Sequence, residues 1–350
     1  MNFLRFSLIA SLASAVALPV SMAQTTATTD PVGFTTVSIT AGTGTAKRNT
    51  FFSLPLLETL ENFSGNAAGT ITGVGATTIS DSSANWAAGA LSQVASPYVI
   101  MITSGAAEGA MFLISSTSPN TSTSVTISST DTAQVPNLAN LGVASGNTYK
   151  IFACDTLSSF FGVPSPTGIS GGTSPSTADT ILITVNGSAS TYYYNTTLGR
   201  WTRVAFGNPS AANTPLLPYY GLQYQRLGST ALSFVTTGNV PTISRKVQVK
   251  NSGVTLLAQY WPTSSTLSSL GLQSMPGWAS GNAQTGDNVL VTTGGSTLTY
   301  YYDGTNWRRV AFGNPISNNV EIPIGSAVQL SKKGNSPGYA TLAQIRPYSL

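Results

Sequence analysis

Short apolar runs broken by turn residues recur along most of the chain, and this pattern predicts strands. In the segment 65–155, alternating stretches such as SPYVIMITSG, TSVTISST and GNTYKIFA are separated by turns at intervals of roughly 8 to 12 residues, which is typical of an all-β domain. The most apolar stretch, YVIMITSGAAEGAMFLI, is interrupted by polar residues and glycines. It therefore predicts two strands joined by a turn, and we expect no transmembrane helix.

The C-terminal half contains an internal repeat. Residues 179–194, DTILITVNGSASTYYY, align without gaps with residues 287–302, DNVLVTTGGSTLTYYY. After a turn of different length, WTRVAFGNP (201–209) matches WRRVAFGNP (307–315) at eight of nine positions, and the length change marks a loop. Each copy predicts a meander: a β-branched strand, a tight hairpin at Asn186-Gly187 or Gly294-Gly295, the tyrosine strand, and Trp-x-Arg-Val-Ala-Phe as the third strand.

Alternation along the third strand places Trp201 and Arg203 on one face, opposite Val204 and Phe206. Tyr192 and Tyr194 of the tyrosine strand likewise share a face. We call the face that carries tyrosines, tryptophan and arginine the aromatic face, and its candidate ligand-binding residues are Tyr192, Tyr194, Trp201 and Arg203 in the first copy and Tyr300, Tyr302, Trp307 and Arg309 in the second. Displayed in this way, the rings could stack on sugars and the arginines could hydrogen-bond to them. The competing interpretation, favoured by the tendency of Trp and Tyr to be partly buried, is cross-strand packing in the core hairpin of a duplicated unit.

These patterns predict an all-β protein made of tandem small β-sandwich or barrel units, with a duplicated C-terminal β-meander unit. The expected ranges are a signal peptide over 1–23, N-terminal strands over 24–64, a β-domain over 65–155, and repeat units over 156–250 and 251–350. If residues 31–57 supply strands to the first repeat, then 65–155 is an insertion.

The N-terminus has the three parts of a secretory signal. Arg5 lies in a short basic start, an apolar run follows over residues 6–20, and the small residues Ser21 and Ala23 flank Met22. This is the pattern of a cleaved leader, and the apolar run is shorter than a membrane span requires. We expect cleavage after Ala23 and a secreted protein, extracellular or on the outer cell surface, with the periplasm as a further possible location.

Composition removes several kinds of chemistry. The chain has no histidine and one cysteine, Cys154, which excludes Ser-His-Asp and Cys-His catalysis, thiolate metal sites and an intrachain disulfide. We expect Cys154 to be a buried small hydrophobe. Charged residues make up 7% of the chain and hydrophobic ones 41%, so low charge does not indicate disorder here. We expect no metal and no cofactor.

Carboxylates offer the remaining route to catalysis, since a glycoside hydrolase needs two of them at a suitable separation. The candidates are Asp155, Asp179, Asp287 and Asp303. Each stands beside a strand end or turn, where Asp commonly caps backbone groups. We therefore expect structural roles for them and predict that the protein is not an enzyme.

Charge is distributed unevenly between the two halves. Residues 24–175 contain three basic and seven acidic side chains, whereas residues 176–350 contain eleven basic and four acidic ones. Such asymmetry can attract an acidic polymer or let the tail of one molecule meet the head of another. A chance imbalance on a solvated surface is the alternative, because the charges form no dense run.

The start TDPVGFTTVSI, the stretches TSGAAEGAMFLIS and GNTYKIFACDTLSSFFG, and the TYYY…W meander resemble a paralogous family of secreted Ser/Thr-rich proteins from Verrucomicrobia and relatives. The similarity covers nearly the whole mature chain, although each motif is short. The resemblance implies an exported bacterial protein at or outside the outer membrane, and it brings no catalytic residues.

The sequence thus favours a secreted, non-enzymatic structural or interaction protein of the bacterial cell surface or extracellular matrix. Its expected partner is itself or a cell-surface polysaccharide, and not a nucleic acid. The first alternative is a carbohydrate-binding protein that uses the duplicated Tyr/Trp/Arg hairpin face. The second, less favoured, is an aspartate-dependent hydrolase.

Overall fold

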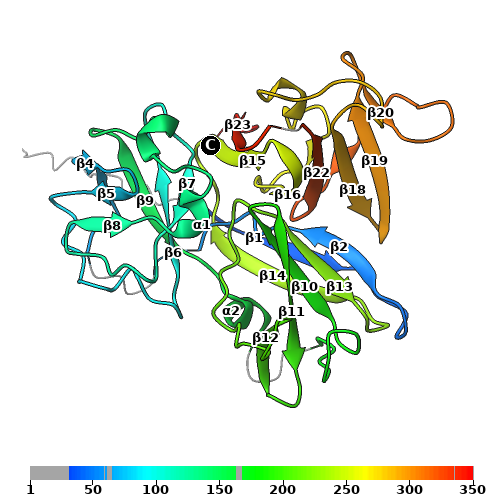
Figure 1. Cartoon of the computed structure of the whole chain (residues 1–350), viewed down its shortest axis with the longest axis horizontal. Helices are drawn as coiled ribbons and strands as arrows, with labels where there is room; N and C mark the ends of the chain where they lie inside the picture. The colour runs from blue at the N-terminus through cyan, green and yellow to red at the C-terminus, as the bar shows by residue number, and fades with distance from the viewer. Residues whose placement is uncertain (1–30, 59, 61–64, 163–167, 335, 350) are drawn as a thin grey trace, which may run out of the picture. The chain divides into compact units, whose positions relative to one another are not determined.

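The computed structural model describes residues 31–58, 60, 65–162, 168–334 and 336–349. The expected signal peptide and its cleavage site after Ala23 lie outside these residues. Antiparallel strands dominate the described part of the chain, and its two α-helices are short (Figure 1). The prediction of an all-β fold is confirmed.

The first repeat folds as a five-stranded sheet and a two-stranded ribbon. The sheet has the order β12-β11-β10-β13-β2, and the ribbon pairs β1 with β14. Both layers contribute to one core, which includes Val37 of the ribbon and Ile181 of the sheet. The elements are β1 (Val32–Ile39), β2 (Arg48–Phe52), α2 (Leu157–Phe161), β10 (Thr180–Val185), β11 (Ser188–Asn195), β12 (Arg200–Arg203), β13 (Leu222–Arg226) and β14 (Leu232–Asn239).

The second repeat builds the same arrangement. Its sheet has the order β16-β22-β18-β19-β20, its ribbon pairs β15 with β23, and β17 pairs with β21. Val289 lies opposite Tyr300, as Ile181 lies opposite Tyr192 in the first copy. The elements are β15 (Arg245–Lys250), β16 (Ser252–Ala258), β17 (Ser265–Thr266), a 3-10 helix (Leu272–Ser274), β18 (Asn288–Thr293), β19 (Ser296–Tyr302), β20 (Trp307–Arg309), β21 (Glu321–Ile322), β22 (Ala327–Lys333) and β23 (Tyr339–Gln344).

The predicted hairpin turns have the required backbone. Asn186 and Gly187 have φ values of 54° and 73°, and Gly294 and Gly295 have 58° and 79°. Positive φ at both central residues gives the turn a twist that matches the flanking strands. The two-residue hairpins therefore fix the registers of β10 with β11 and of β18 with β19.

Strand pairing also relates the repeats to the rest of the chain. β1 and β2 pair with β14 and β13, so the segment 31–57 supplies strands to the first repeat. β15 pairs with β23, which starts the second repeat at 245 rather than at the expected 251.

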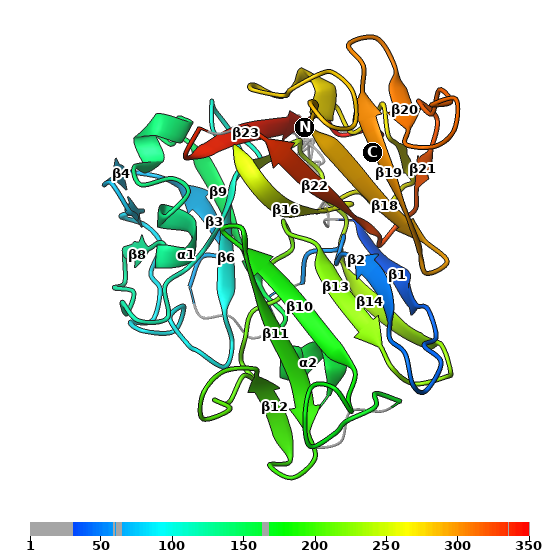
Figure 2. The ribbon, with the colours of Figure 1, turned by 45° about the vertical axis from the view of Figure 1, so that its right-hand side comes forward.

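The two sheets meet through the bridges of Phe52 with Ser326 and of Tyr220 with Leu257. Consequently β12 and β20 lie at the far edges of the two sheets (Figure 2).

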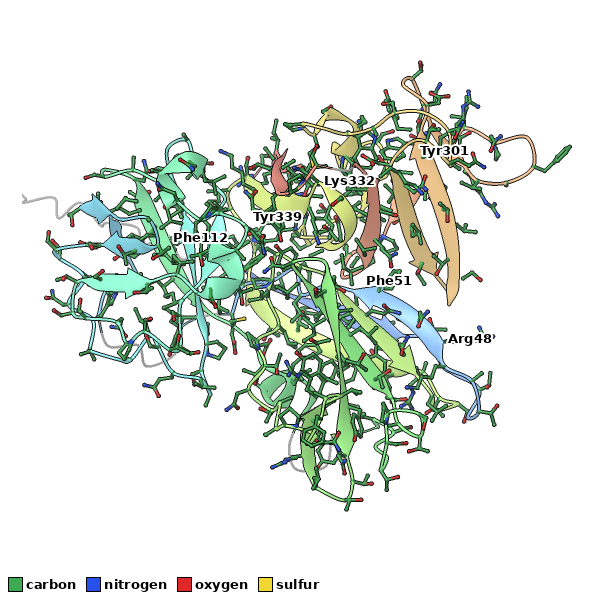
Figure 3. The ribbon with its side chains drawn as sticks, viewed as in Figure 1. Arg48, Phe51, Phe112, Tyr301, Lys332 and Tyr339 are labelled. Carbon is green, nitrogen blue, oxygen red and sulfur yellow. The ribbon has the colours of Figure 1, made fainter. Side chains whose placement is uncertain are left out.

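Residues 65–155 form separate sheets with the orders β3-β9-β6-β7 and β4-β5-β8. The stretch YVIMI…MFLI forms β6 and β7 as predicted, and Phe112 of β7 lies in the core of this unit (Figure 3). Glu58 bridges Ala153, so the chain enters and leaves the unit at neighbouring points. The elements are β3 (Ala68–Thr70), β4 (Gly73–Val74), β5 (Thr78–Ser80), β6 (Tyr98–Ile102), β7 (Met111–Leu113), β8 (Ser124–Thr126), α1 (Ser129–Thr132), a 3-10 helix (Leu138–Leu141) and β9 (Thr148–Ala153).

Among the described residues, no helix combines the length and the apolar character that crossing a membrane requires. The predicted absence of a transmembrane helix therefore holds for this part of the chain.

Cys154 is a buried free cysteine, as expected. Its burial, which is the largest cause, raises the pKa of the thiol far above its usual range, so the thiol is kept protonated and unreactive.

Asp131 of α1 is buried, and none of the described lysines or arginines forms an ion pair with it. Its carboxylate accepts hydrogen bonds from the Leu113 backbone N–H (2.5 Å) and from the Tyr219 hydroxyl (2.8 Å). Burial raises the pKa of Asp131 to about 7, although both hydrogen bonds act in the opposite direction. Tyr220 and Lys246 line the same small cavity, and the charge of Asp131 also acts on Cys154.

This environment predicts a pH dependence of folding. The pKa of Asp131 is higher in the folded protein than in the unfolded chain, because the ionised form is penalised by burial. Relative to an Asp131→Asn variant, the wild type should lose stability as pH rises from about 4 to about 7, by up to about 1.4 kcal/mol per pH unit, and no further above that range. Urea unfolding of both proteins across this range measures the difference. Parallel stability curves would contradict the assignment.

Candidate functional site

The aromatic face predicted to bind sugars is buried. Trp201 and Trp307 are 1% and 0% exposed, and their rings pack edge-on or tilted against Tyr194 and Tyr302, with centroid distances of 5.9 and 5.5 Å. Tyr192, Tyr194 and Tyr300 are buried and Tyr302 is half-buried, whereas Arg203 and Arg309 are exposed. Rings enclosed in a core cannot stack on a sugar. The structure therefore corrects the platform hypothesis and favours the packing interpretation.

The third strand of each meander is shorter than predicted. β12 ends at Arg203 and β20 at Arg309, so Val204 and Phe206 do not lie on a strand face. The chain instead turns back, and the Arg203 N–H donates to the Pro209 carbonyl at 3.0 Å. We call residues 203–209 and 309–315, both with the sequence Arg-Val-Ala-Phe-Gly-Asn-Pro, the tip loops.

The tip loops have the same backbone in both repeats. The Asn208 N–H donates to the Ala205 carbonyl at 3.0 Å, as Asn314 does to Ala311. Gly207 has a φ of 77° at the third position of this turn, where a type II turn requires positive φ and hence favours glycine. Phe206 and Phe312 occupy the second position of their turns. The turn therefore holds each phenylalanine at the apex of its loop.

The side chains at the apex of the tip loops are displayed to solvent. Phe206 and Phe312 are fully exposed, and Val204 and Val310 are nearly half exposed. Large apolar side chains in this position contribute nothing to the core. The turn Asn186-Gly187 changed to Gly294-Gly295 between the copies, yet the seven tip-loop residues are identical. The sequence showed this identity, but the prediction extended the third strand through the phenylalanine and so placed Phe206 on a strand face opposite Trp201 and Arg203.

The candidate catalytic aspartates have structural roles. Asp179 accepts hydrogen bonds from the Tyr224 hydroxyl (2.9 Å) and the Leu227 N–H (2.6 Å), and it pairs with Arg226. Asp287 pairs with Lys332 at 2.5 Å in the second repeat. Both carboxylates are almost completely buried.

The other two aspartates stabilise local turns. Asp303 accepts from the backbone N–H groups of Asn306 and Thr305 and pairs with Arg308. These bonds, with that from Asn306 contributing most, lower the pKa of Asp303 to about 2. Asp155 accepts from the Ser159 hydroxyl at 2.7 Å. In the described part of the chain, no group of three or more His, Cys, Asp or Glu side chains is placed so that it could hold a metal ion.

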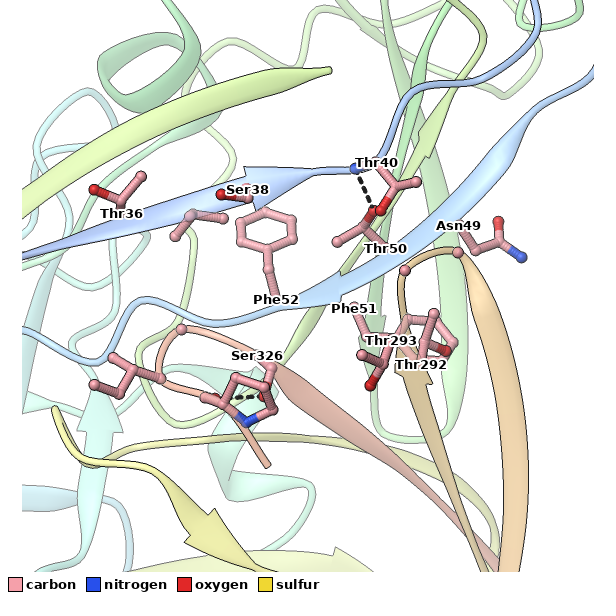
Figure 4. A pocket seen from close by; sticks show the side chains of 16 residues that line it. Thr36, Ser38, Thr40, Asn49, Thr50, Phe51, Phe52, Thr292, Thr293 and Ser326 are labelled. Atoms are coloured by element: carbon pink, nitrogen blue, oxygen red, sulfur yellow. Dashed lines mark hydrogen bonds between the residues drawn. The ribbon is translucent and has the colours of Figure 1, made fainter. Parts of the chain in front are cut away.

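A cavity of about 290 Å³ opens between β1, β2 and the second repeat (Figure 4). Its walls carry hydroxyl groups from serines and threonines, together with Phe51 and Phe52, and none of its lining residues is charged. The Thr40 N–H donates to the Thr50 hydroxyl at 3.0 Å across one wall. Such a wall can hydrogen-bond a neutral ligand, but it offers no acid or base for catalysis.

No protein-family model matches the chain, no curated protein matches its sequence, and no solved structure matches its fold. The resemblance to secreted proteins of Verrucomicrobia stays a prediction.

Proposed function

We propose that this chain is a secreted, non-enzymatic interaction protein of the bacterial cell surface or extracellular matrix, and that it binds its partners through the two tip loops. The observation that carries the proposal is the fully exposed phenylalanine at the apex of each loop. Aromatic and arginine side chains supply most of the energy of typical protein interfaces. Each tip loop presents both kinds.

Backbone order in the tip loops supports the same function. The hydrogen bond between Asn208 and Ala205 and its counterpart in the second copy close each turn before any partner binds. A loop that is already in its bound conformation loses less conformational entropy on binding. An exposed phenylalanine held in this way is suited to enter a pocket on another molecule.

Duplication makes the protein bivalent. The tip loops follow β12 and β20, which lie at the far edges of the two repeat sheets. Identical loops imply one class of partner at both edges, and two linked contacts increase the overall affinity far beyond that of either one. A bivalent protein that acts by binding is suited to connecting molecules in surface or matrix material.

The proposal predicts that a Phe206→Ser/Phe312→Ser variant folds normally but is not retained on cells. Cells of the producing bacterium whose own copy carries the same two substitutions would be incubated with purified, tagged protein and washed, and the retained tag would be measured by immunoblot. We expect retention to fall about tenfold or more, because interface anchors are lost. Ile345→Ser, which changes another strongly exposed side chain, is the matched control. Equal retention of the wild type and the double variant would refute the proposed role of the loops.

A further inference from the structure

The uncharged cavity bounded by β1, β2 and the second repeat (Figure 4), which we call the edge cavity, has a counterpart in the other repeat. With the aligned strands β10 and β18 as the origin, the strand registers match Thr50 of β2 with Thr255 of β16. The Thr40 N–H donates to the Thr50 hydroxyl at 3.0 Å, and the Lys250 N–H donates to the Thr255 hydroxyl at 3.2 Å. The ends of β1 and β15 therefore correspond.

In the second repeat, the strand edge at this place is paired. Lys246 of β15 corresponds to Thr36 of β1, because each lies four residues before the donor at the end of its strand. The Lys246 N–H donates to the Gly109 carbonyl at 2.9 Å, and Ala110 forms a parallel bridge with Lys246. A Cβ on Gly109 would collide with the Ser244 carbonyl, so this close approach requires glycine. A short segment of the 65–155 unit thus adds backbone hydrogen bonds to the edge of β15.

In the first repeat, the same edge faces the edge cavity. Alternate residues of an antiparallel strand direct their backbone N–H and C=O groups to opposite sides. The Thr40 N–H points away from β14, to Thr50, and the N–H groups of Thr36 and Ser38 therefore point the same way. Both residues line the edge cavity, and outside the pairing of β1 with β14 neither forms a backbone hydrogen bond with another described residue. The edge of β1 thus offers donors and acceptors to a ligand.

Three long side chains of the first repeat hold the 65–155 unit beside β15. Asn186, Tyr219 and Tyr220 donate side-chain hydrogen bonds of 3.1, 2.8 and 2.5 Å to acceptors within residues 130–134. The bonds lie close to the edge of β15, since Tyr219 and Tyr220 line one small cavity with Lys246. The pairing of that edge therefore depends on side chains that reach it from the other repeat.

The second repeat has small residues at the corresponding places. The repeat alignment matches Asn186 with Gly294, and the two bridges that join the sheets match the tyrosines with Gly325 and Ser326. All three small residues line the edge cavity, and a Cβ on Gly294 would meet no atom within 4 Å. The edge cavity therefore exists because these positions carry no long side chain.

We propose that the edge cavity binds a short peptide segment of a partner protein, which pairs with β1 at Thr36 and Ser38. Peptides that add to a sheet edge gain affinity from backbone hydrogen bonds and specificity from side-chain contacts. The volume of about 290 Å³ and the uncharged lining select glycine and small uncharged side chains, as Gly109 and Ala110 are at the edge of β15. A neutral sugar would find hydroxyl groups here, but it could not continue the backbone pairing.

This site is separate from the tip loops, and the inference does not depend on the proposed function. The loops present an aromatic side chain to a pocket on another molecule, whereas the edge cavity receives a segment of backbone. The Phe206→Ser/Phe312→Ser variant should therefore bind a peptide at the edge cavity as the wild type does. Failure of either proposal leaves the other unaffected.

Peptide binding to the purified protein tests the inference. The probe is a fluorescein-labelled peptide with the sequence of residues 106–113 and the change Glu108→Gln, and the measurement is its fluorescence anisotropy. We expect saturable binding to the wild type and about tenfold weaker binding to Thr36→Pro, because proline removes the donor N–H. Proline is tolerated in an edge strand where the lost N–H does not face the neighbouring strand.

Val235→Pro is the matched control. Val235 of β14 lies directly opposite Thr36, and its side chain is also exposed. The two residues share one cross-strand pair, so the N–H of Val235 points away from β1, to the far edge of the ribbon. The same substitution is thus made in the same ribbon on the other edge, and the peptide should bind Val235→Pro as it binds the wild type.

Ser326→Tyr tests the cavity without changing the backbone of β1. It introduces the side chain that the first repeat has at the corresponding position, Tyr220, and this side chain should fill the edge cavity. Peptide binding should again weaken about tenfold, because the space for the segment is lost. This variant keeps the inference testable if Thr36→Pro does not fold.

Three results would overturn the inference. The first is the absence of saturable peptide binding at wild-type concentrations up to about 0.5 mM. The second is equal weakening by Thr36→Pro and Val235→Pro, and the third is unchanged binding to Ser326→Tyr, since either would place the peptide elsewhere. Maltohexaose serves as a second probe, and saturable binding of this sugar without binding of the peptide would assign the cavity to neutral saccharides instead.

Discussion

An Asp287→Ala variant is expected to unfold with a free energy about 3 to 5 kcal/mol below that of the wild type. Asp287 is completely buried and pairs with the equally buried Lys332. Removing the carboxylate leaves a cation enclosed without its counter-charge, which is far more costly than the loss of a surface pair. The N–H groups of Ala279 and Lys333 also lose their acceptor.

The first repeat offers the parallel experiment, because Asp179 holds Arg226 in the corresponding strand. We expect Asp179→Ala to have an effect of similar size. Asp303→Ala, which breaks a partly exposed pair with Arg308, should cost about 1 kcal/mol or less. Urea unfolding followed by tryptophan fluorescence compares the three variants.

A second substitution shows whether the enclosed charge causes the loss. Adding Lys332→Met to Asp287→Ala should recover part of the stability, since no unpaired cation then stays buried. Recovery should be incomplete, because Lys332 also donates to the Gly277 carbonyl and lies over the Trp278 ring. A double variant no more stable than Asp287→Ala would show that the buried cation is not the source.

Trp201→Ala and Trp307→Ala are each expected to cost about 3 to 5 kcal/mol, since both rings fill the cores of their repeats. Trp→Phe should discriminate between them. Trp201 donates its indole N–H to the Gly162 carbonyl at 3.2 Å, whereas the indole N–H of Trp307 is buried with no partner among the described residues. The Trp→Phe change should therefore cost about 1 kcal/mol more at position 201.

Phe312→Ala is the control, because this ring is fully exposed and its loss should change stability by less than about 0.5 kcal/mol. The same denaturant titrations provide the measurement. A tryptophan variant as stable as Phe312→Ala would mean that the aromatic face is not packed. That result would support the interpretation in which its rings stack on sugars.

Local chemistry was sufficient to predict the meanders. Period-two alternation, β-branched residues and the dipeptides Asn186-Gly187 and Gly294-Gly295 act within a few residues of each other, so they identified the strands, the hairpins and the repeat. The same local reasoning gave the two strands of the YVIMI…MFLI stretch and the burial of Cys154. The end of the third strand was missed, although Gly207 and Asn208, both with positive φ, are a turn signal of the same local kind.

The candidate site depended on contacts between distant segments. Alternation of apolar and polar residues shows which side chains share a face of a sheet. It does not show which of the two faces is buried, because that depends on the segments that pack against the sheet. The first repeat is completed by β1 and β2, which lie more than a hundred residues before its meander in the sequence. The cavity beside Phe51 and Phe52 likewise combines Thr36, Thr292 and Gly325 from three separate parts of the chain.

The sequence by itself therefore determined the strand pattern, the duplication and the scarcity of catalytic residue types, because these follow from neighbouring residues and composition. Tertiary structure alone decided that the tryptophans are enclosed, that Phe206 and Phe312 are displayed, and that Asp179 and Asp287 meet buried cations. Burial and ion pairing arise from long-range packing, which local patterns do not specify.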